Sequence, residues 1–133
     1  MGFDSPAPFR EFEARVYAHR KALRSLIDAL NSDHKTILGY GASTKGNVVL
    51  QFCGFGERDI PCIAEINPDK YGVFTPGTRI PIVSDAEASA MKADYYLVLP
   101  WHFKDGIVRR EQAFLAGGGK LIIPFPEIEI IGG

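Results

Sequence analysis

The sequence predicts an α/β fold: a doubly wound, mostly parallel sheet of about five strands that follows a long N-terminal helix. Three observations support this prediction. Short runs of mainly apolar residues recur along the chain, they lack a regular polar alternation, and segments with helical spacing or helix caps separate them. Such runs are typical of parallel strands buried on both faces, and the helices between them supply the crossovers. The expected fold is therefore Rossmann-like.

Length, composition and charge narrow the class of protein. The chain has 133 residues, 46% hydrophobic and 23% charged, which fits one domain with a real core over residues 1–133. Fifteen basic residues against 16 acidic ones leave a net charge of −1, which argues against non-specific nucleic-acid binding. No apolar run approaches the roughly 20 residues that cross a bilayer, and the first residues do not resemble a signal peptide. We therefore expect a cytoplasmic protein without nucleic-acid or membrane partners.

The first predicted element is one long helix from Phe9 to Leu30. Its apolar residues recur mostly at three- and four-residue steps, with charged residues between them. The run Asp4-Ser5-Pro6 offers a cap followed by a proline, and Asn31-Ser32-Asp33 supplies the stop. We assign this helix to packing, without a chemical role.

The remaining elements are predicted to alternate between strands and helices. Strands are expected at residues 35–39, 60–66, 79–83, 95–99 and 120–124. Helices are expected at residues 44–52, from a capping box at 84–87 to residue 91, and at 104–116, before a run of three glycines.

Chemically unusual segments follow three of these strands, at residues 39–45, 65–67 and 100–102. In open parallel sheets, ligands bind beyond the carboxyl ends of the strands, near the point where strand order reverses. The coincidence of these segments at one edge is the main functional signal in the chain.

The glycine-rich turn, Gly39-Tyr40-Gly41-Ala42-Ser43-Thr44-Lys45-Gly46, joins the first strand to its helix. Its leading glycines allow a tight turn that leaves helix N-terminal amides free to bind an anion. Ser43 and Thr44 add hydroxyl donors, and Lys45 adds a positive charge. The pattern is neither the full dinucleotide fingerprint, because Thr44 replaces the third glycine, nor a P-loop. We favour phosphate binding over a purely structural turn because of Lys45.

Glu65 ends the second strand, where a carboxylate can accept hydrogen bonds from ribose hydroxyls. An equally strong interpretation is a solvated acid, or one paired with Lys70 or Arg79. Asn67 and the loop at residues 71–78 are close enough in sequence to cover the same site, although the proline and glycine of the loop favour a structural turn.

Pro100-Trp101-His102-Phe103 follows the strand at residues 95–99. Trp101 can stack on a base, and His102 can donate to a phosphate or move a proton. In the alternative interpretation, Trp101 and Phe103 cover the end of the core and His102 faces solvent. Cys53 and Cys62 form neither a disulfide framework nor a zinc site. The residues alone therefore indicate a fold that binds a phosphorylated or nucleotide ligand, without a recognisable catalytic motif.

The order of the motifs is more specific than any one of them. The motifs are Gly39 to Asn47 with Leu50-Gln51, Glu65 to Gly72, Thr75 to Thr78, Ile80-Pro81-Ile82 and Asp94 to Phe103. Together they resemble the C-terminal domain of sugar C-methyltransferases, S-adenosylmethionine-dependent enzymes that methylate a carbon of nucleotide-linked keto-deoxysugars. The resemblance extends from about Phe9 to Glu127.

The resemblance implies a larger enzyme, with an N-terminal zinc-binding region, a central methyl-donor domain and this Rossmann-like domain. The zinc cysteines and the central domain with its base do not occur in this sequence. We therefore expect either an excised domain or a free-standing relative that keeps the ligand-binding half. It is not expected to transfer a methyl group alone or to bind a cofactor itself, S-adenosylmethionine belonging to the full-length enzyme.

The resemblance also implies site residues, all of them for the substrate and none catalytic or metal-binding. Phosphate contacts are expected from the glycine-rich turn, above all from Gly41, Ser43, Thr44 and Lys45, with Gly39, Tyr40 and Ala42 beside them. Ribose or base contacts are expected from Glu65 and Asn67, while Trp101 and His102 would line a cleft shared with the central domain. In the intact enzyme, a proton beside the sugar ketone is removed and the enolate attacks the donor methyl, so this domain contributes positioning.

Two alternatives stay open. A glycine turn followed by an acid at the end of the second strand is also a methyl-donor signature, so the domain itself can be a binder of S-adenosylmethionine. The other alternative is a non-catalytic interaction or assembly module whose ligand site is vestigial.

Overall fold

The computed structural model describes residues 7–132 and contains one six-stranded sheet with the strand order β3-β2-β1-β4-β5-β6. Five strands run parallel, and β6 is antiparallel to β5. The strands are β1 (Ile37–Tyr40), β2 (Ile63–Glu65), β3 (Ile82–Ser84), β4 (Tyr95–Val98), β5 (Lys120–Ile123) and β6 (Glu129–Ile131). The predicted α/β class with a mostly parallel, doubly wound sheet is confirmed.

Within residues 7–132, five α-helices and two short 3-10 helices accompany the strands. The α-helices are α1 (Ala7–Ser32), α2 (Thr44–Cys53), α3 (Asp85–Ala90), α4 (Lys104–Arg110) and α5 (Gln112–Ala116), and the 3-10 helices are η1 (Pro68–Lys70) and η2 (Trp101–Phe103). The long helix α1 is present as predicted, and it ends at the predicted stop. The predicted cap Asp4-Ser5-Pro6 lies outside the described residues. Of the helices in residues 7–132, none is long and apolar enough to cross a bilayer.

The helices cover the two faces of the sheet in separate groups. On one face, α1 and α2 enclose a core that includes Leu23, Ile27 and Leu50, all fully buried. On the other face, α3, α4 and α5 enclose a second core that includes Ala88 and Ile107. The continuous apolar character of β1, β2, β4 and β5 follows from this arrangement, because helices cover these strands on both faces of the sheet.

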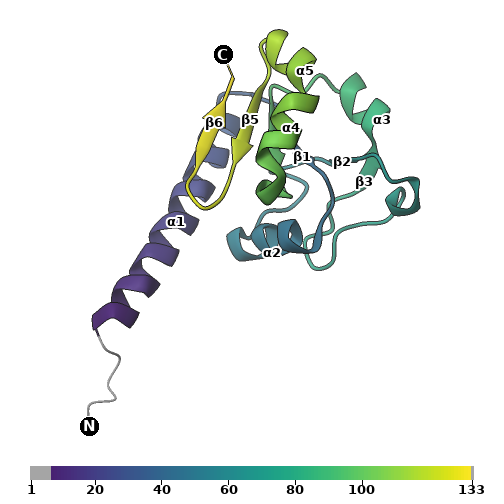
Figure 1. Cartoon of the computed structure of the whole chain (residues 1–133). Coiled ribbons are helices and arrows are strands. Elements are labelled where there is room, and N and C mark those ends of the chain that lie inside the picture. The colour runs from purple at the N-terminus through teal and green to yellow at the C-terminus, as the bar shows by residue number, and fades with distance from the viewer. Residues whose placement is uncertain (1–6, 133) are drawn as a thin grey trace.

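Helix α1 extends well beyond the sheet at its N-terminal end (Figure 1). Its C-terminal half is held by Arg24, whose two terminal nitrogens donate to the carboxylate of Asp59 at 3.1 and 3.0 Å. Asn31 adds a bond from its side-chain amide to the carbonyl of Asp59 at 3.2 Å. A paired, fork-like contact of this kind fixes orientation as well as distance, so α1 is fastened to the segment that precedes β2.

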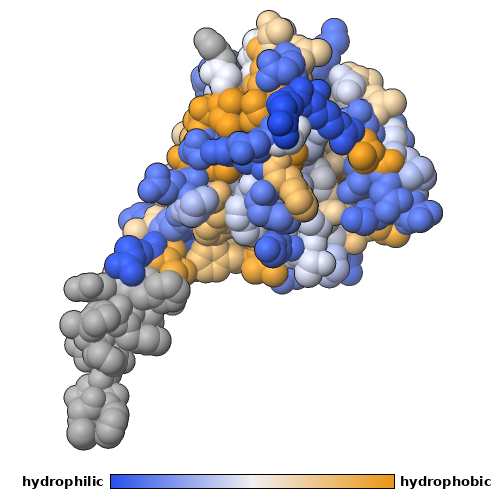
Figure 2. Space-filling view, viewed as in Figure 1, coloured by the Kyte–Doolittle hydropathy of each residue, from blue (hydrophilic) through white to orange (hydrophobic). Residues whose placement is uncertain are grey.

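Strand order reverses between β1 and β4, which lie side by side in the middle of the sheet. The connection through α2 leads from β1 to β2 in one direction, and the connection through α4 and α5 leads from β4 to β5 in the other. The loops that leave the carboxyl ends of β1 and β4 therefore diverge, and the crevice between them is where such sheets bind ligands. Strongly hydrophilic residues are visible over α4, whose last turn carries the exposed Arg109 and Arg110 (Figure 2).

Two expectations about the C-terminal half were wrong. The sheet has six strands instead of about five, because Glu129–Ile131 adds an antiparallel edge strand to β5. The helix predicted over residues 104–116 is two helices that meet at Glu111. The hydroxyl of Tyr40 donates to Glu111 at 2.7 Å, and this contact from the middle of the sheet lies at the break.

Candidate functional site

The glycine-rich turn leaves β1 with its backbone pressed against the neighbouring strands. The amide of Gly41 donates to the carbonyl of Ala64 at 2.8 Å, which extends the β1–β2 pairing into the turn. Gly41 has a φ of 79°, and a Cβ atom at this position would lie 3.0 Å from the ring of Pro100. Only glycine combines this left-handed backbone with so close an approach. The turn is thus fixed between the ends of β2 and β4.

Glu65 holds the turn from the end of β2, and its side chain is only 9% exposed. One carboxylate oxygen accepts from the amide of Ala42 at 2.9 Å. The other accepts from the amides of Ile66 and Asn67, each at 2.9 Å. Both oxygens of the residue that the sequence suggested for ribose binding are therefore engaged by the backbone. Glu65 acts here as a brace between β2 and the glycine-rich turn.

Lys70 completes this arrangement, as one of the two interpretations of Glu65 anticipated. Its ammonium group donates to the carbonyl of Ala42 at 2.8 Å and lies 3.9 Å from a Glu65 oxygen. Sequence reasoning named Lys70 only as a partner of Glu65 and missed it as a site residue. The available signal was its position in the Asn67-Pro68-Asp69-Lys70 run directly after β2, where η1 folds the lysine back over the turn.

Ser43 caps α2 in the structure. Its hydroxyl oxygen accepts from the amide of Gly46 at 3.0 Å, and its own carbonyl accepts from Asn47. The amides of Thr44 and Lys45 belong to the first turn of the helix, where an amide has no acceptor within the helix. The positive end of the α2 dipole and these two amides therefore point out of the carboxyl edge of the sheet.

A cavity of about 310 Å³, the α2-side cavity, lies between the start of α2 and the loop at residues 71–78. Its polar lining comes from Ser43, Thr44, Asn47, Lys70 and Thr75. The side chain of Gln51 donates to the carbonyl of Pro76 at 2.9 Å and so fastens the loop to α2.

Asn47 contributes an unusual atom to the wall of the α2-side cavity. Within residues 7–132, its Oδ1 atom is buried and has no hydrogen-bond partner. An unpaired buried acceptor costs about 1–3 kcal/mol, so this wall is better suited to a hydrogen-bond donor than to a dry apolar group.

A second cavity of about 380 Å³, the α4-side cavity, lies on the other side of the glycine-rich turn. Its apolar lining comes from Tyr40, Ala64, Ile66, Pro100, Phe103 and Ile107, with Glu65, Asp85 and Arg110 as the charged residues. Ala42 and Ser43 line both cavities, so the turn is the partition between them.

Tyr40 forms part of the floor of the α4-side cavity. Burial, together with the hydrogen bond to Glu111, raises the pKa of the Tyr40 hydroxyl well above its ordinary value of 10.0. The hydroxyl is therefore a fixed neutral donor that faces α4 and α5, and we find no role for it as an acid near neutral pH.

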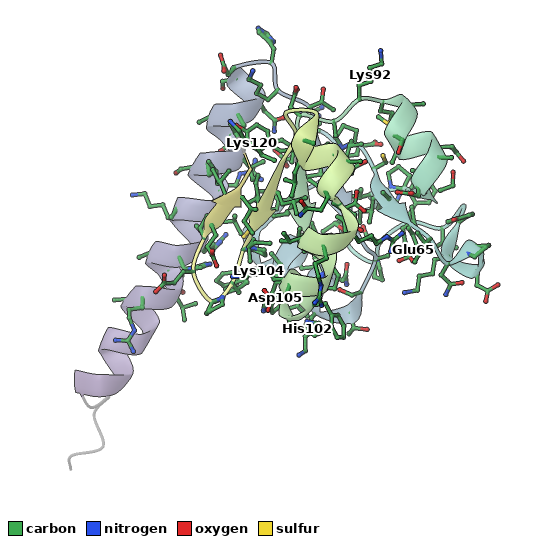
Figure 3. The ribbon with its side chains drawn as sticks, turned by 45° about the horizontal axis from the view of Figure 1, so that its top comes forward. Glu65, Lys92, His102, Lys104, Asp105 and Lys120 are labelled. Carbon is green, nitrogen blue, oxygen red and sulfur yellow. The ribbon has the colours of Figure 1, made fainter. Side chains whose placement is uncertain are left out.

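Trp101 and His102 lie elsewhere. They line another groove, of about 600 Å³, between α4 and the segment before β6. Phe103 lines both this groove and the α4-side cavity. The Trp101 ring packs on Phe125 with 5.2 Å between centroids, and His102 is exposed. Figure 3 shows His102 beside Asp105 at one end of α4, apart from Glu65. The predicted site residues are thus not all brought together.

Three further predicted residues line neither cavity. Lys45 is exposed on the first turn of α2, and Asn67 is exposed, its side chain accepting from the amide of Asp69 at 3.1 Å. Gly39 lies inside β1, where a Cβ atom would stand 2.7 Å from Ile63. Of the predicted set, Glu65 and the turn residues from Tyr40 to Thr44 therefore line the two cavities, and the others do not.

Comparison with known proteins agrees with this architecture. The family model of the C-methyltransferase C-terminal domain matches residues 1–126. The chain belongs to this family. The C-methyltransferase NovU of Streptomyces niveus is 38% identical over 131 residues, a match that covers 98% of this C-methyltransferase C-terminal domain. The chain spans 31% of the length of NovU, so most of that relative has no counterpart here.

Proposed function

We propose that this C-methyltransferase C-terminal domain binds a nucleotide-linked sugar at the carboxyl edge of its sheet, with the diphosphate over the glycine-rich turn. The observation that carries the proposal is that this turn lies between two cavities at the carboxyl edge of the sheet. Ala42 and Ser43 border both the α2-side and the α4-side cavity, so one extended ligand can cross the turn and enter both. Each cavity falls within the size range of small-molecule sites.

The groups around the turn suit an anion. The amides of Thr44 and Lys45 stand at the positive end of α2, and the ammonium group of Lys70 lies within hydrogen-bonding distance of Ala42. Lys70 lines the α2-side cavity, and Lys45 is an exposed lysine on the first turn of α2. A diphosphate here accepts hydrogen bonds from groups that the fold already holds in place, which reduces the cost of ordering them.

In a full-length enzyme, the task of this domain is positioning. Methylation of a sugar carbon needs the substrate and the methyl donor in one geometry, and a domain that anchors the nucleotide restricts the sugar to that geometry. We propose S-adenosylmethionine as the methyl donor of the full-length enzyme and assign the base that removes the sugar proton to a part of the enzyme beyond this chain.

The residues of this domain do not fit S-adenosylmethionine itself. Ribose recognition in Rossmann-like folds uses a strand-end carboxylate with free acceptor oxygens. Both Glu65 oxygens accept backbone amides, and Lys70 lies 3.9 Å away, which also places a positive charge where a sulfonium ligand would add another. The positive charge of Lys70 favours a nucleotide sugar, whose diphosphate is anionic, over a sulfonium ligand.

Isothermal titration calorimetry on this chain tests the proposal. Thymidine diphosphate is expected to bind, and S-adenosylhomocysteine is expected to give no heat beyond a buffer blank. Lys70→Ala and Lys45→Ala should both weaken the binding of thymidine diphosphate. For Lys70→Ala the affinity should fall about tenfold, because a charge-assisted hydrogen bond is lost. Lys35→Ala is the matched control, since this exposed lysine precedes the opposite, amino end of β1.

Three results would contradict the proposal. Absence of any heat or thermal shift with thymidine diphosphate would favour the assembly module. Heat with S-adenosylhomocysteine in place of thymidine diphosphate would favour the methyl-donor alternative. Unchanged affinity for thymidine diphosphate in both Lys70→Ala and Lys45→Ala would show that the phosphates do not bind at the turn.

A further inference from the structure

We propose that the α4-side cavity is the nucleobase subsite of this domain, in which the base lies against Phe103 and Ile66 with its edge toward Asp85 and Arg110. This inference rests on the function proposed above, because it divides the nucleotide ligand between the two cavities. None of these four residues belongs to the set that the sequence suggested for the site.

Two large apolar side chains line this cavity while remaining in contact with water. Phe103, at the end of η2, is 63% exposed, and Ile66, directly after β2, is 55% exposed. They come from the loops that follow two different strands, so the cavity has apolar surfaces of separate origin. A flat heterocycle that enters the cavity covers both, and an aromatic ring next to a base adds stacking to the area that is buried.

The charged residues at this cavity suit the edge of a base, because they offer it both an acceptor and a donor. Asp85, the first residue of α3, offers a carboxylate that accepts N–H donors. Arg110, in the last turn of α4, offers N–H donors to a ring carbonyl or ring nitrogen; its Nε atom is 3.7 Å from Glu111. A nucleobase edge carries donors and acceptors side by side and can use both residues, whereas a phosphate carries only acceptors and can use Arg110 but not Asp85.

Contacts within the protein hold the floor of the α4-side cavity in place. The Tyr40 ring is held by the bond of its hydroxyl to Glu111 at 2.7 Å and by an edge contact with the Tyr96 ring at 5.5 Å between centroids. Ala64, the small neighbour on β2, leaves space above the sheet at the end of β1. Because these groups are fixed by the core, the subsite does not need to reorganise when a ring enters.

The two cavities therefore differ in the part of the ligand that they suit. The α2-side cavity has Lys70 and the hydroxyl of Thr44, and it accepts the hydroxyl-bearing sugar next to the diphosphate. The α4-side cavity has apolar walls and an acid–base pair of charges, and it accepts the ring. The diphosphate crosses between them at Ala42 and Ser43, which line both.

The test compares Phe103→Ala with Phe74→Ala. Phe74 is 60% exposed, lies on the loop at residues 71–78 and lines neither cavity, so the two variants remove equally exposed rings. Calorimetry with thymidine diphosphate should show about tenfold weaker binding for Phe103→Ala, since loss of one stacking ring has an effect of that order. Phe74→Ala should bind like the parent, and inorganic pyrophosphate should bind both variants within twofold of the parent.

Asp85→Asn supplies a second variant that keeps the side-chain shape. It should weaken the binding of thymidine diphosphate by about threefold. The affinity for pyrophosphate should be unchanged or higher, because a repulsive carboxylate is gone. If thymidine diphosphate binds the parent and both variants alike, the base lies elsewhere and the subsite is refuted while the proposed function stands. If thymidine diphosphate does not bind the parent at all, the proposed function itself fails.

Discussion

The two strand–loop–helix units that meet at the switch point, β1–α2 and β4–α4, are built in opposite ways. In β1–α2, side chains brace the loop: Glu65 accepts the amide of Ala42, Lys70 donates to its carbonyl, and Ser43 caps the helix. In β4–α4, the residue before the helix, Phe103, makes no capping bond with its side chain, and its ring is largely exposed. One loop is held by internal bonds, and the other displays its side chains to solvent.

The glycines of the two helices show the same contrast. A Cβ atom on Gly46 of α2 would stand 2.3 Å from the Cβ atom of Leu99, so the helix packs directly on the chain that leaves β4. A Cβ atom on Gly106 of α4 would meet nothing within 4 Å. A tightly packed, hydrogen-bonded loop suits the fixed geometry of a diphosphate, and an open aromatic loop suits a surface that a ring can cover.

Removing the brace should have the largest effect on β1–α2. Glu65→Ala leaves three backbone amides without their acceptor, and we expect a loss of about 3 kcal/mol in the free energy of unfolding, because hydrogen bonds to a buried charged group are strong. Urea denaturation measures it. Glu57→Ala, at an exposed acid in the loop after α2, should change stability by less than about 0.5 kcal/mol. Equal stability of the two variants would show that the turn does not depend on Glu65.

Adding one methyl group to each helix tests the difference in packing between the two units directly. Gly46→Ala should destabilise the domain by about 2 kcal/mol, since the clash with Leu99 outweighs the better helix propensity of alanine. Gly106→Ala should stabilise it by about 0.5–1 kcal/mol, because alanine gains the propensity and meets no neighbour. Thermal unfolding of both variants in one buffer is sufficient. The same sign of effect in both would contradict the difference in packing.

A loss smaller than those of Glu65→Ala and Gly46→Ala is expected where the two units touch. Tyr40→Phe removes the bond to Glu111 and should cost about 1 kcal/mol at pH 7. Burial and that bond raise the pKa of Tyr40 above its unfolded value near 10.0, so its contribution is complete below about pH 10 and is lost as pH rises further. The stability gap between parent and variant should therefore narrow above pH 10. Tyr17→Phe, at an exposed position of α1, should show no gap at either pH.

Much of the fold could be predicted because it depends on contiguous residues. The apolar runs marked β1, β2, β4 and β5, and the Ser84 cap of α3 was predicted and is present, with the serine oxygen accepting from the amide of Glu87 at 3.1 Å. Strand β6 was missed because its residues are half exposed and become a strand by pairing with β5. The break between α4 and α5 was missed because nothing in their own periodicity marks Glu111.

Within the candidate site, the residue types were found more readily than their roles. Gly41 and Ser43 were placed correctly in the turn, because glycines before a helix start are a local signal. The bonds of Glu65 to Ala42, Ile66 and Asn67 could not be assigned, since the first depends on the parallel pairing of β1 with β2. Phosphate binding at the turn stays a prediction until the titrations are made.

The sequence by itself determined the α/β class, the place of the glycine-rich turn and the membership in a family of C-methyltransferase C-terminal domains. The first two follow from local residue order, since periodicity and turn chemistry act over a few neighbouring positions. The family follows from the similarity of the whole motif series to known members. Only the tertiary structure decided that Glu65 braces the turn, that Trp101 and His102 face another groove, and that two unlike cavities share Ala42 and Ser43. These properties depend on which strands become neighbours, and strand order sets contacts between residues far apart in the chain.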